Sequence, residues 1–257
     1  MARLVQQVRE SPDVCPYLPQ QQASLEVRVM VDVAPAELMG LLERGWRRFG
    51  PVYFRPACGA CHECVSLRLP VASFHASASQ RRARQKASRL TRVVGSPEVD
   101  AERLALYERW HVDRKAHRGW ESSDMSADRY ASEFAFPHPC VREVSFRDPE
   151  RAGALVGVGI VDAVPNALSA VYFFWDPEHA PPSLGVAHVV LLIESAAARG
   201  LDYVYLGYRV AGCPSLAYKA RYQPHQVLDG RPGDLEAPRW RFPMQDAYPS
   251  PSSEASG

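Results

Sequence analysis

The sequence predicts an α+β fold, and three observations carry that prediction. Three β-rich segments that suit antiparallel strands follow one another at Cys140–Arg147, Gly153–Asp162 and Leu168–Trp175. A long helix, Leu184–Arg199, is expected to end at Gly200. A further strand follows at Tyr203–Leu206, and antiparallel strands followed by a strand–helix–strand unit belong to the α+β class.

The stretch Leu168–Pro224 is expected to hold the working site. Ser183 can cap the long helix, which follows the Pro-rich loop Asp176–Pro182. A strand that ends beside the start of a helix offers a ligand free backbone N–H groups. The order helix, three strands, helix, strand, helix is characteristic of the acyltransferase fold that N-acetyltransferases use. We therefore predict an acetyltransferase-like (GNAT-type) core.

The rest of the chain is expected to form a smaller N-terminal part and a tail. Before the three core strands we expect three earlier strands, at Leu25–Val33, Trp46–Pro56 and Val65–Leu69. We also expect four helices in this part of the chain, at Ala36–Arg44, Ser77–Arg92, Glu98–His117 and Ala127–Phe136. We expect a Cys-containing and basic subdomain over residues 1–95 and the acetyltransferase-like domain over residues 96–240. The Pro- and Ser-rich tail, residues 241–257, is expected to be disordered.

Composition indicates a soluble globular protein of the cytoplasm. Hydrophobic residues make up 46% of the 257 residues and charged residues 23%, which is an ordinary balance for that class. No apolar run approaches a membrane span, and the N-terminus lacks the apolar core of a secretion signal. We therefore expect a cytoplasmic location and no membrane partner. The net charge of +1 gives no overall argument for a nucleic-acid partner.

The distribution of charge is more informative than its sum. No acidic residue lies between Glu63 and Glu98, and the basic residues in that gap are Arg68, Arg81, Arg82, Arg84, Lys86, Arg89 and Arg92. A helix that is basic almost all round is costly unless it faces a polyanion, and phosphate backbone is the obvious one. The alternative is a solvated helix that the acids of Glu98–Asp113 neutralise.

Six cysteines in a cytoplasmic protein suit thiol or metal chemistry better than disulfides. Cys58, Cys61 and Cys64 lie within seven residues, and Cys15 between prolines is the natural fourth ligand. Four thiolates suit tetrahedral zinc or an iron–sulfur cluster, with His62 as an alternative ligand. The alternative is that these small residues fill a core or sense oxidants.

The sequence lacks the motifs of serine hydrolases, zinc proteases and P-loop proteins. Asp176 can act as a base, although an Asp-Pro step is also typical of a turn. Ser183, Leu184 and Gly185 at the start of the long helix can hold an anion or a carbonyl oxygen. Cys213 suits packing or substrate contact better than catalysis, because no base partner is evident.

Several motifs together resemble those of one enzyme family. They are Cys15-Pro-Tyr-Leu-Pro, Gly45-Trp-Arg-Arg, Cys58-x-x-Cys-x-x-Cys, Ser79-Gln-Arg-Arg, Ser183-Leu-Gly, Tyr203-Val-Tyr-Leu-Gly-Tyr and Tyr218-Lys-Ala-Arg-Tyr-Gln-Pro. In this order they resemble the aminoacyl-tRNA–protein transferases from Cys15 to about Trp240. The group that the sequence resembles most is the bacterial aspartate/glutamate leucyltransferases, which are related to the arginyltransferases.

The resemblance implies an acetyltransferase-like fold and a specific reaction. The enzyme takes leucine from leucyl-tRNA and joins it to the N-terminal Asp or Glu of an acceptor protein, which creates a degradation signal. No cofactor is required for the transfer, because an aminoacyl ester is already activated. Related arginyltransferases are associated with an iron–sulfur cluster in the N-terminal cysteine region, which implies Cys15, Cys58, Cys61 and Cys64 as its ligands.

The resemblance also implies roles for residues in the motifs. Ser79, Gln80, Ser183, Leu184, Gly185 and Gly207 are implied in substrate binding. The acidic side chain of the acceptor needs a cation, for which Arg81, Arg82, Lys219 and Arg221 are candidates. Tyr208 and Tyr218, with Asp176, are the catalytic candidates, and the tyrosines can orient the amine or the terminal adenosine.

Departures from the family pattern leave two alternatives open. The helix after Gly185 reads VAHVVLLIE where the family has a Tyr and a Trp, and Pro214–Leu216 replaces a Lys-Met. One alternative is the same chemistry with arginine as the donor. The other is a non-catalytic tRNA-binding or redox-sensing protein on the same scaffold.

Overall fold

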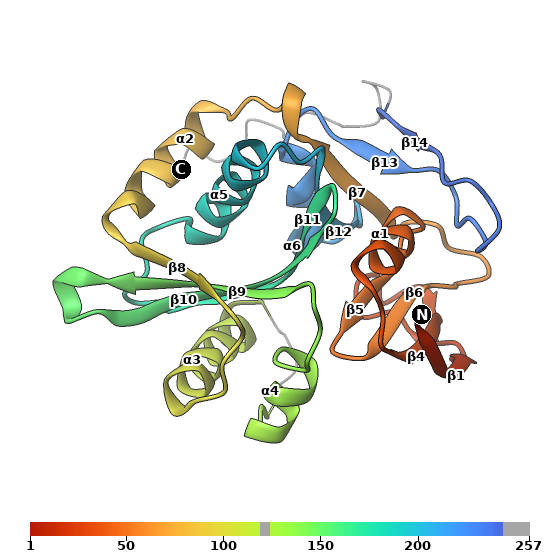
Figure 1. Cartoon of the computed structure of the whole chain (residues 1–257), viewed down its shortest axis with the longest axis horizontal. Coiled ribbons are helices and arrows are strands. Elements are labelled where there is room, and N and C mark those ends of the chain that lie inside the picture. Colours follow the sequence, from red (N-terminus) through yellow and green to blue (C-terminus); the bar gives the residue numbers. More distant parts are fainter. Residues whose placement is uncertain (119–123, 244–257) are drawn as a thin grey trace.

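A sheet of eight strands runs through the computed structural model, which describes residues 1–118 and 124–243 (Figure 1). Neighbouring strands are antiparallel except β11 and β12, which are parallel. Across the sheet the order is β14 (Trp240–Arg241), β13 (Gln226–Leu228), β7 (Val65–Pro70), β12 (Tyr203–Arg209), β11 (Ala167–Trp175), β10 (Ala154–Val164), β9 (Val141–Asp148) and β8 (Thr91–Gly95).

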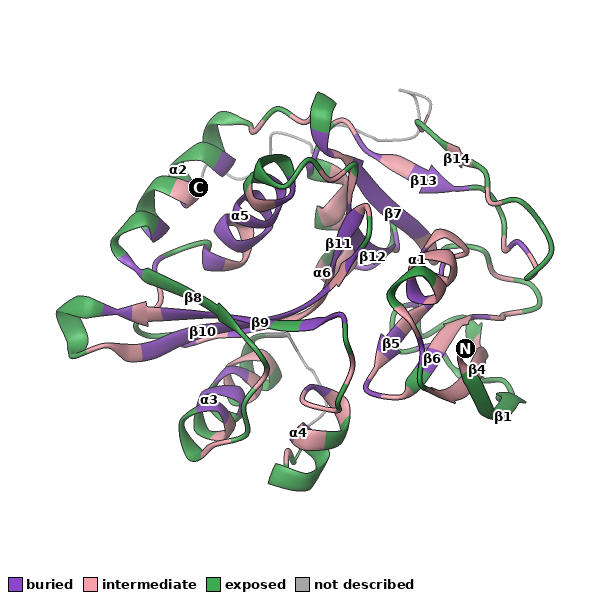
Figure 2. Cartoon of the chain, viewed as in Figure 1, coloured by how far each residue is buried: buried purple, intermediate pink, exposed green. Residues whose placement is uncertain are grey.

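Helices cover both faces of this sheet. On one face lie α5 (Leu184–Ala198) and α2 (Ala78–Lys86), and on the other lie α3 (Ala101–Arg118) and α4 (Ala127–Glu133) (Figure 1). Figure 2 shows that the purple, buried sides of α5 and α3 face the sheet. Because it is covered on both faces, β10 is buried along nearly its whole length and lacks the polar–apolar alternation of a half-exposed strand.

A smaller sheet packs beside the large one. Its order is β1 (Arg3–Arg9), β4 (Leu25–Val31), β6 (Val52–Pro56) and β5 (Arg47–Phe49), with α1 (Pro35–Glu43) next to it. Trp46 and the apolar side of α1 pack against Val164, Ala167 and Tyr205 of the large sheet. Arg48 also donates from Nε to Oδ2 of Asp162 at 3.0 Å, and both side chains are almost fully buried. The two sheets therefore share one apolar core and one buried ion pair.

Short elements complete the described chain. They are β2 (Asp13–Val14), β3 (Gln22–Ala23), a turn of α-helix α6 (Pro214–Ala217) and the 3₁₀ turns Val71–Ser73, Ala87–Arg89, Pro149–Arg151 and Tyr218–Arg221. None of the helices within residues 1–118 and 124–243 is long and apolar enough to cross a membrane.

The α+β class and the predicted order of core elements are confirmed. The long helix ends one residue before the predicted Arg199. A single helix over Ser77–Arg92 is wrong, because α2 ends at Lys86 and Thr91–Gly95 pairs with the edge strand β9 as β8. The strands of residues 1–24 were not expected from the sequence.

The predicted division at residue 95 stays a prediction. The large sheet draws β7 and β8 from before that boundary and its other strands from after it. Of the tail predicted to be disordered, residues 244–257 lie outside the described residues.

Candidate functional site

The parallel strands β11 and β12 pair only where they begin. Their register joins Ala167 to Tyr203, Leu168 to Val204 and Ser169 to Tyr205. Beyond Ser169, β11 continues to Trp175 along β10, whereas β12 continues to Arg209 along β7. The two strands part, which leaves one side of the β11 backbone without a strand partner. Such a gap at the centre of a sheet is a place where a ligand can reach backbone groups.

Arg47 of β5 enters the gap between the two strands. Its Nη1 donates to Oγ of Ser169 at 2.8 Å, and its Nη2 donates to the carbonyl of Ala170. On the other side lies Gly207 of β12, whose φ is +76°. A Cβ at Gly207 would stand 3.2 Å from Nε of Arg47, so glycine suits both the backbone angle and the close approach. Arg47 thus links both strands across the gap.

Lys219 lies beside Arg47. Its Nζ donates to the carbonyl of Tyr208 at 2.9 Å. Burial, and then the positive charge of Arg47, lower the pKa of Lys219 to about 7, and Cys213 and Cys64 oppose that shift only in part. An amine with that pKa is largely uncharged at slightly alkaline pH and can accept a proton.

Tyr208 holds the end of β12 in place. Its hydroxyl donates to the carbonyl of Gly45 at 2.8 Å, and the carbonyl of Phe54 lies 3.2 Å away. Burial raises the pKa of this hydroxyl well above its ordinary value, so it stays protonated. The hydroxyl thus holds the end of β12, and the backbone carbonyl of Tyr208 accepts from Lys219. A catalytic role for Tyr208 stays a prediction. Tyr218 lies on the neighbouring 3₁₀ turn and is 40% exposed, and a catalytic role for it stays a prediction.

The contacts of Asp176 favour its interpretation as a turn residue. Its Oδ1 accepts from the backbone N–H groups of Glu178 and His179 and from Nδ1 of His179, all at 3.0 Å. Its Oδ2 accepts from Arg109 at 3.2 Å. Burial alone would raise the pKa of Asp176, but these hydrogen bonds outweigh it and lower that pKa. A carboxylate with a lowered pKa is a weak base.

The start of α5 differs from the sequence-based expectation. Ser183 makes no capping hydrogen bond with its side chain and has a φ of +66°, so the predicted side-chain cap is wrong. Its carbonyl instead accepts from the N–H groups of Val186 and Ala187. Leu184 is fully buried, and a Cβ at Gly185 would lie 3.5 Å from the ring of Trp175. A substrate role for Ser183, Leu184 and Gly185 stays a prediction.

The Ser79–Arg82 motif and the Lys219–Arg221 turn lie side by side. Gln80 is buried and its Nε2 donates to the carbonyl of Arg221 at 3.2 Å. Ser79 contacts the hydroxyl of Ser77, which caps α2. Residues that are far apart in the sequence therefore form one surface next to the parted strands.

Part of the basic segment is neutralised, although not by the acids of Glu98–Asp113. Arg84 pairs with Glu194 at 3.0 Å, and Arg89 pairs with Asp148 at 2.8 Å. Arg81, Arg82 and Lys86 are exposed and have no acidic partner within ion-pair distance among the described residues. These three cations form what we call the α2 basic face, and they remain available to a polyanion.

The cysteines gather near the same site. Cys15 and Cys213 are buried with Leu18 and Val210, and Cys64 packs against them. Burial, and then Cys15, Cys58 and Cys61, raise the pKa of Cys64 to about 12. Within residues 1–118 and 124–243, no three Cys, His, Asp or Glu side chains are placed to hold a metal ion. The arrangement does not fit a zinc ion or a cluster as it stands, and metal binding by these cysteines stays a prediction.

The residue that sequence reasoning missed is Arg47. The sequence presents it only as one member of the Gly45-Trp-Arg-Arg motif and predicts no separate role for it. Its partner Ser169 is 122 residues away in the chain, so no local pattern announces the contact. The available signal is a pair of arginines that follows the helix-ending Gly45 after one intervening tryptophan.

Comparisons with known proteins agree across both halves of the chain. Residues 13–82 match the family model "Arginine-tRNA-protein transferase, N terminus", and residues 102–229 match "Arginine-tRNA-protein transferase, C terminus". Arg47 falls in the first match, and Ser169, Gly207 and Lys219 fall in the second. The two matched halves thus meet at the parted strands.

The chain is also similar in sequence to named relatives and in structure to solved proteins. An aspartate/glutamate leucyltransferase of Helicobacter hepaticus is 34% identical over 231 residues, which cover 89% of this chain and 94% of that protein. One of Chromobacterium violaceum is 37% identical over 222 residues, which cover 86% and 89%. Among solved structures, FemX is similar with a TM-score of 0.43 and 10% identity, over 72% of this chain and 63% of that chain.

The low pKa of Lys219 can be measured directly, because the sequence contains only Lys86, Lys115 and Lys219. In a ¹³C NMR titration of the lysine ε-carbons, we expect the signal of Lys219 to titrate near pH 7. Arg47→Gln removes a positive neighbour and should move the low midpoint upward. Arg151→Gln, an exposed arginine on the β9–β10 turn, is the control. Absence of any lysine signal that titrates near pH 7 would contradict the assignment.

Proposed function

The chain belongs to the aminoacyl-tRNA–protein transferase family, and we propose that it transfers leucine from leucyl-tRNA to proteins that begin with Asp or Glu. The observation that carries the proposal is the meeting of Arg47 and Lys219 where β11 and β12 part. The names of the relatives support leucine as the donor and acidic N-termini as the acceptors. The product is a protein with an N-terminal leucine, which marks it for degradation.

The chemistry asks little of the protein beyond positioning and proton transfer. The acceptor amine attacks the carbonyl carbon of the leucyl ester, a C–N bond forms, and the C–O bond to the terminal ribose breaks. Because the ester is already activated, no covalent enzyme intermediate is needed. In this proposal uncharged Lys219 takes the proton that the amine loses and passes it to the ribose oxygen as the C–O bond breaks. General base catalysis of this kind contributes about 10²–10⁴-fold.

Arg47 supplies a fixed positive charge in the same gap. Negative charge develops on the ester carbonyl oxygen during the attack, and a cation held in a partly dry site stabilises it without reorganisation. Hydrogen bonds to Ser169 and Ala170 fix the guanidinium in position. After burial, Arg47 is the second cause that lowers the pKa of Lys219, since a second positive charge beside it is unfavourable.

The two substrates are assigned to different cations. Arg221 is exposed on the turn that carries Lys219, so we assign it to the acidic side chain of the acceptor. The α2 basic face is assigned to the acceptor stem of the tRNA, because phosphate contacts need exposed cations that are not already paired. Gln80 joins the two surfaces through the carbonyl of Arg221.

The donor and acceptor are tested by transfer of labelled amino acids. We expect leucine to pass from leucyl-tRNA to peptides that begin with Asp or Glu and not to peptides that begin with Lys. Transfer from arginyl-tRNA in place of leucyl-tRNA would support arginine as the donor, which is the amino acid that the name of the matched family model gives. Absence of transfer with either tRNA would contradict the proposal and favour a non-catalytic tRNA-binding protein.

The α2 basic face is tested by reversing one charge. Arg82 is exposed and makes no ion pair among the described residues, so Arg82→Glu should leave the fold intact. We expect tRNA to bind about tenfold more weakly at low salt and with a shallower salt dependence. Arg151→Glu, with the same charge change on the β9–β10 turn, should bind as the parent protein does. Equal affinity of both variants at low salt would remove α2 from the tRNA-binding surface.

A further inference from the structure

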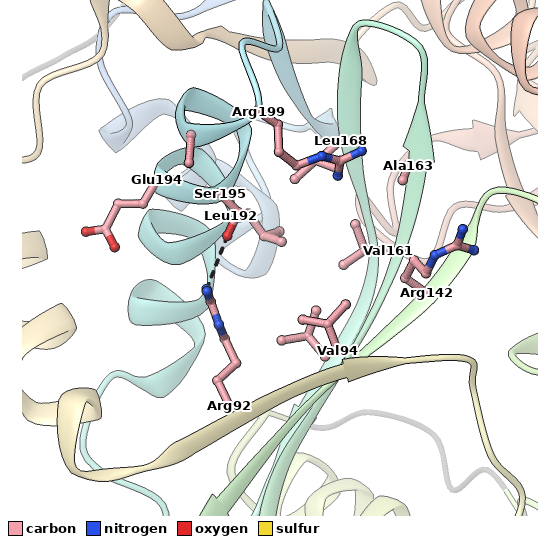
Figure 3. Close-up of a pocket in the computed structure, with 12 residues that line it drawn as sticks. Arg92, Val94, Arg142, Val161, Ala163, Leu168, Leu192, Glu194, Ser195 and Arg199 are labelled. Atoms are coloured by element: carbon pink, nitrogen blue, oxygen red, sulfur yellow. Dashed lines mark hydrogen bonds between the residues drawn. The ribbon is translucent and has the colours of Figure 1, made fainter.

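A hollow of about 400 Å³ lies between the C-terminal half of α5 and strands β8 to β11 (Figure 3). It forms because α5 packs over β11 and β12 and leaves this end of β8, β9 and β10 without a covering helix. None of the residues that line it takes part in the candidate site at Arg47 and Lys219. The hollow is therefore separate from the parted strands.

The floor of the hollow is aliphatic. Its apolar lining residues come from four strands and from α5 and are Val94, Val144, Val161, Ala163, Leu168, Leu192 and Ala198. Val94 is 59% exposed although it lies on the hollow side of the sheet. Covering such surface with an apolar ligand is favourable, in proportion to the area that is removed from water.

Three arginines stand around this floor. Arg92 reaches from β8 to Oγ of Ser195 at 3.2 Å, Arg142 extends from β9, and Arg199 follows the end of α5 (Figure 3). In the described part of the chain none of the three has an acidic side chain within ion-pair distance. The one acid in the lining, Glu194, is already paired with Arg84 at 3.0 Å. The rim therefore keeps an excess of positive charge.

We propose that the hollow binds a small amphipathic anion, with an aliphatic body on the valine floor and a carboxylate or phosphate head among Arg92, Arg142 and Arg199. The volume lies within the ordinary range for small-ligand pockets, about 300–1,000 Å³. Guanidinium groups bind both heads through charge-assisted hydrogen bonds. An aliphatic body is favoured over a nucleobase, because bases are held by stacking on aromatic rings and no lining residue is aromatic.

The proposal is tested by isothermal titration calorimetry with matched ligands on the full chain. Decanoate and decyl phosphate should each bind at one site, and the tighter of the two identifies the head group. Decanol lacks the charge and inorganic phosphate lacks the body, so each should bind at least about tenfold more weakly, as expected for the loss of one strong contact. Adenosine 5′-monophosphate should bind no better than inorganic phosphate.

Two variants place the binding in the hollow. Arg199→Ala removes one cation of the rim, and Ala198→Phe fills the hollow from an exposed position of α5, so neither disturbs the core. Both should weaken decanoate binding by about tenfold, whereas Arg151→Ala should bind as the parent protein does. The proposal is overturned if decanol or adenosine 5′-monophosphate binds as tightly as decanoate, if neither long-chain anion binds, or if both variants retain full affinity.

Discussion

The contact of Arg47 and Arg48 with the large sheet is the interaction on which the rest of the structure depends. Ser169 and Asp162 stand opposite each other in the β10–β11 register. Arg47 binds the first and Arg48 binds the second, so two neighbouring residues of the small sheet engage one cross-strand pair. Burying a guanidinium group is costly unless it finds hydrogen-bond partners. Arg48 donates from all three of its nitrogens to Asp162 and Gly50, and Arg47 donates from Nη1 and Nη2 to Ser169 and Ala170, which offsets that cost.

This contact connects the fold to the proposed chemistry. Because Arg47 occupies the gap between β11 and β12, its charge adds to the effect of burial and helps to lower the pKa of Lys219 to about 7. The buried hydroxyl of Tyr208 fixes the end of β12, and the backbone carbonyl of Tyr208 holds Lys219. An activated ester needs only a base, a fixed positive charge and correct placement. The hollow beneath α5 is independent of this arrangement, since it shares none of its residues.

Local patterns predicted most of the large sheet and its helices, because strands such as Leu168–Trp175 and the helix before Gly200 are specified by their own residues. Long-range pairing explains what was missed. The segment at Thr91–Gly95 has no strong strand signal and becomes β8 by adding to the edge of β9. The motifs Ser79–Arg82 and Lys219–Arg221 can be recognised in the sequence, but no local pattern predicts that they lie side by side. The structure shows this through the hydrogen bond from Gln80 to the carbonyl of Arg221. Arg47 was overlooked because both of its partners are more than a hundred residues away.

The central claim is that acyl transfer takes place where β11 and β12 part, beside Arg47 and Lys219. The most direct test is a crystal structure with 3′-leucylamido-adenosine, in which a stable amide replaces the reactive ester. The account predicts that the leucyl carbonyl oxygen lies within hydrogen-bond distance, about 3 Å, of Arg47 or Lys219 in the gap. An analogue bound only on α2, or in the hollow beneath α5, with both residues untouched, would contradict it.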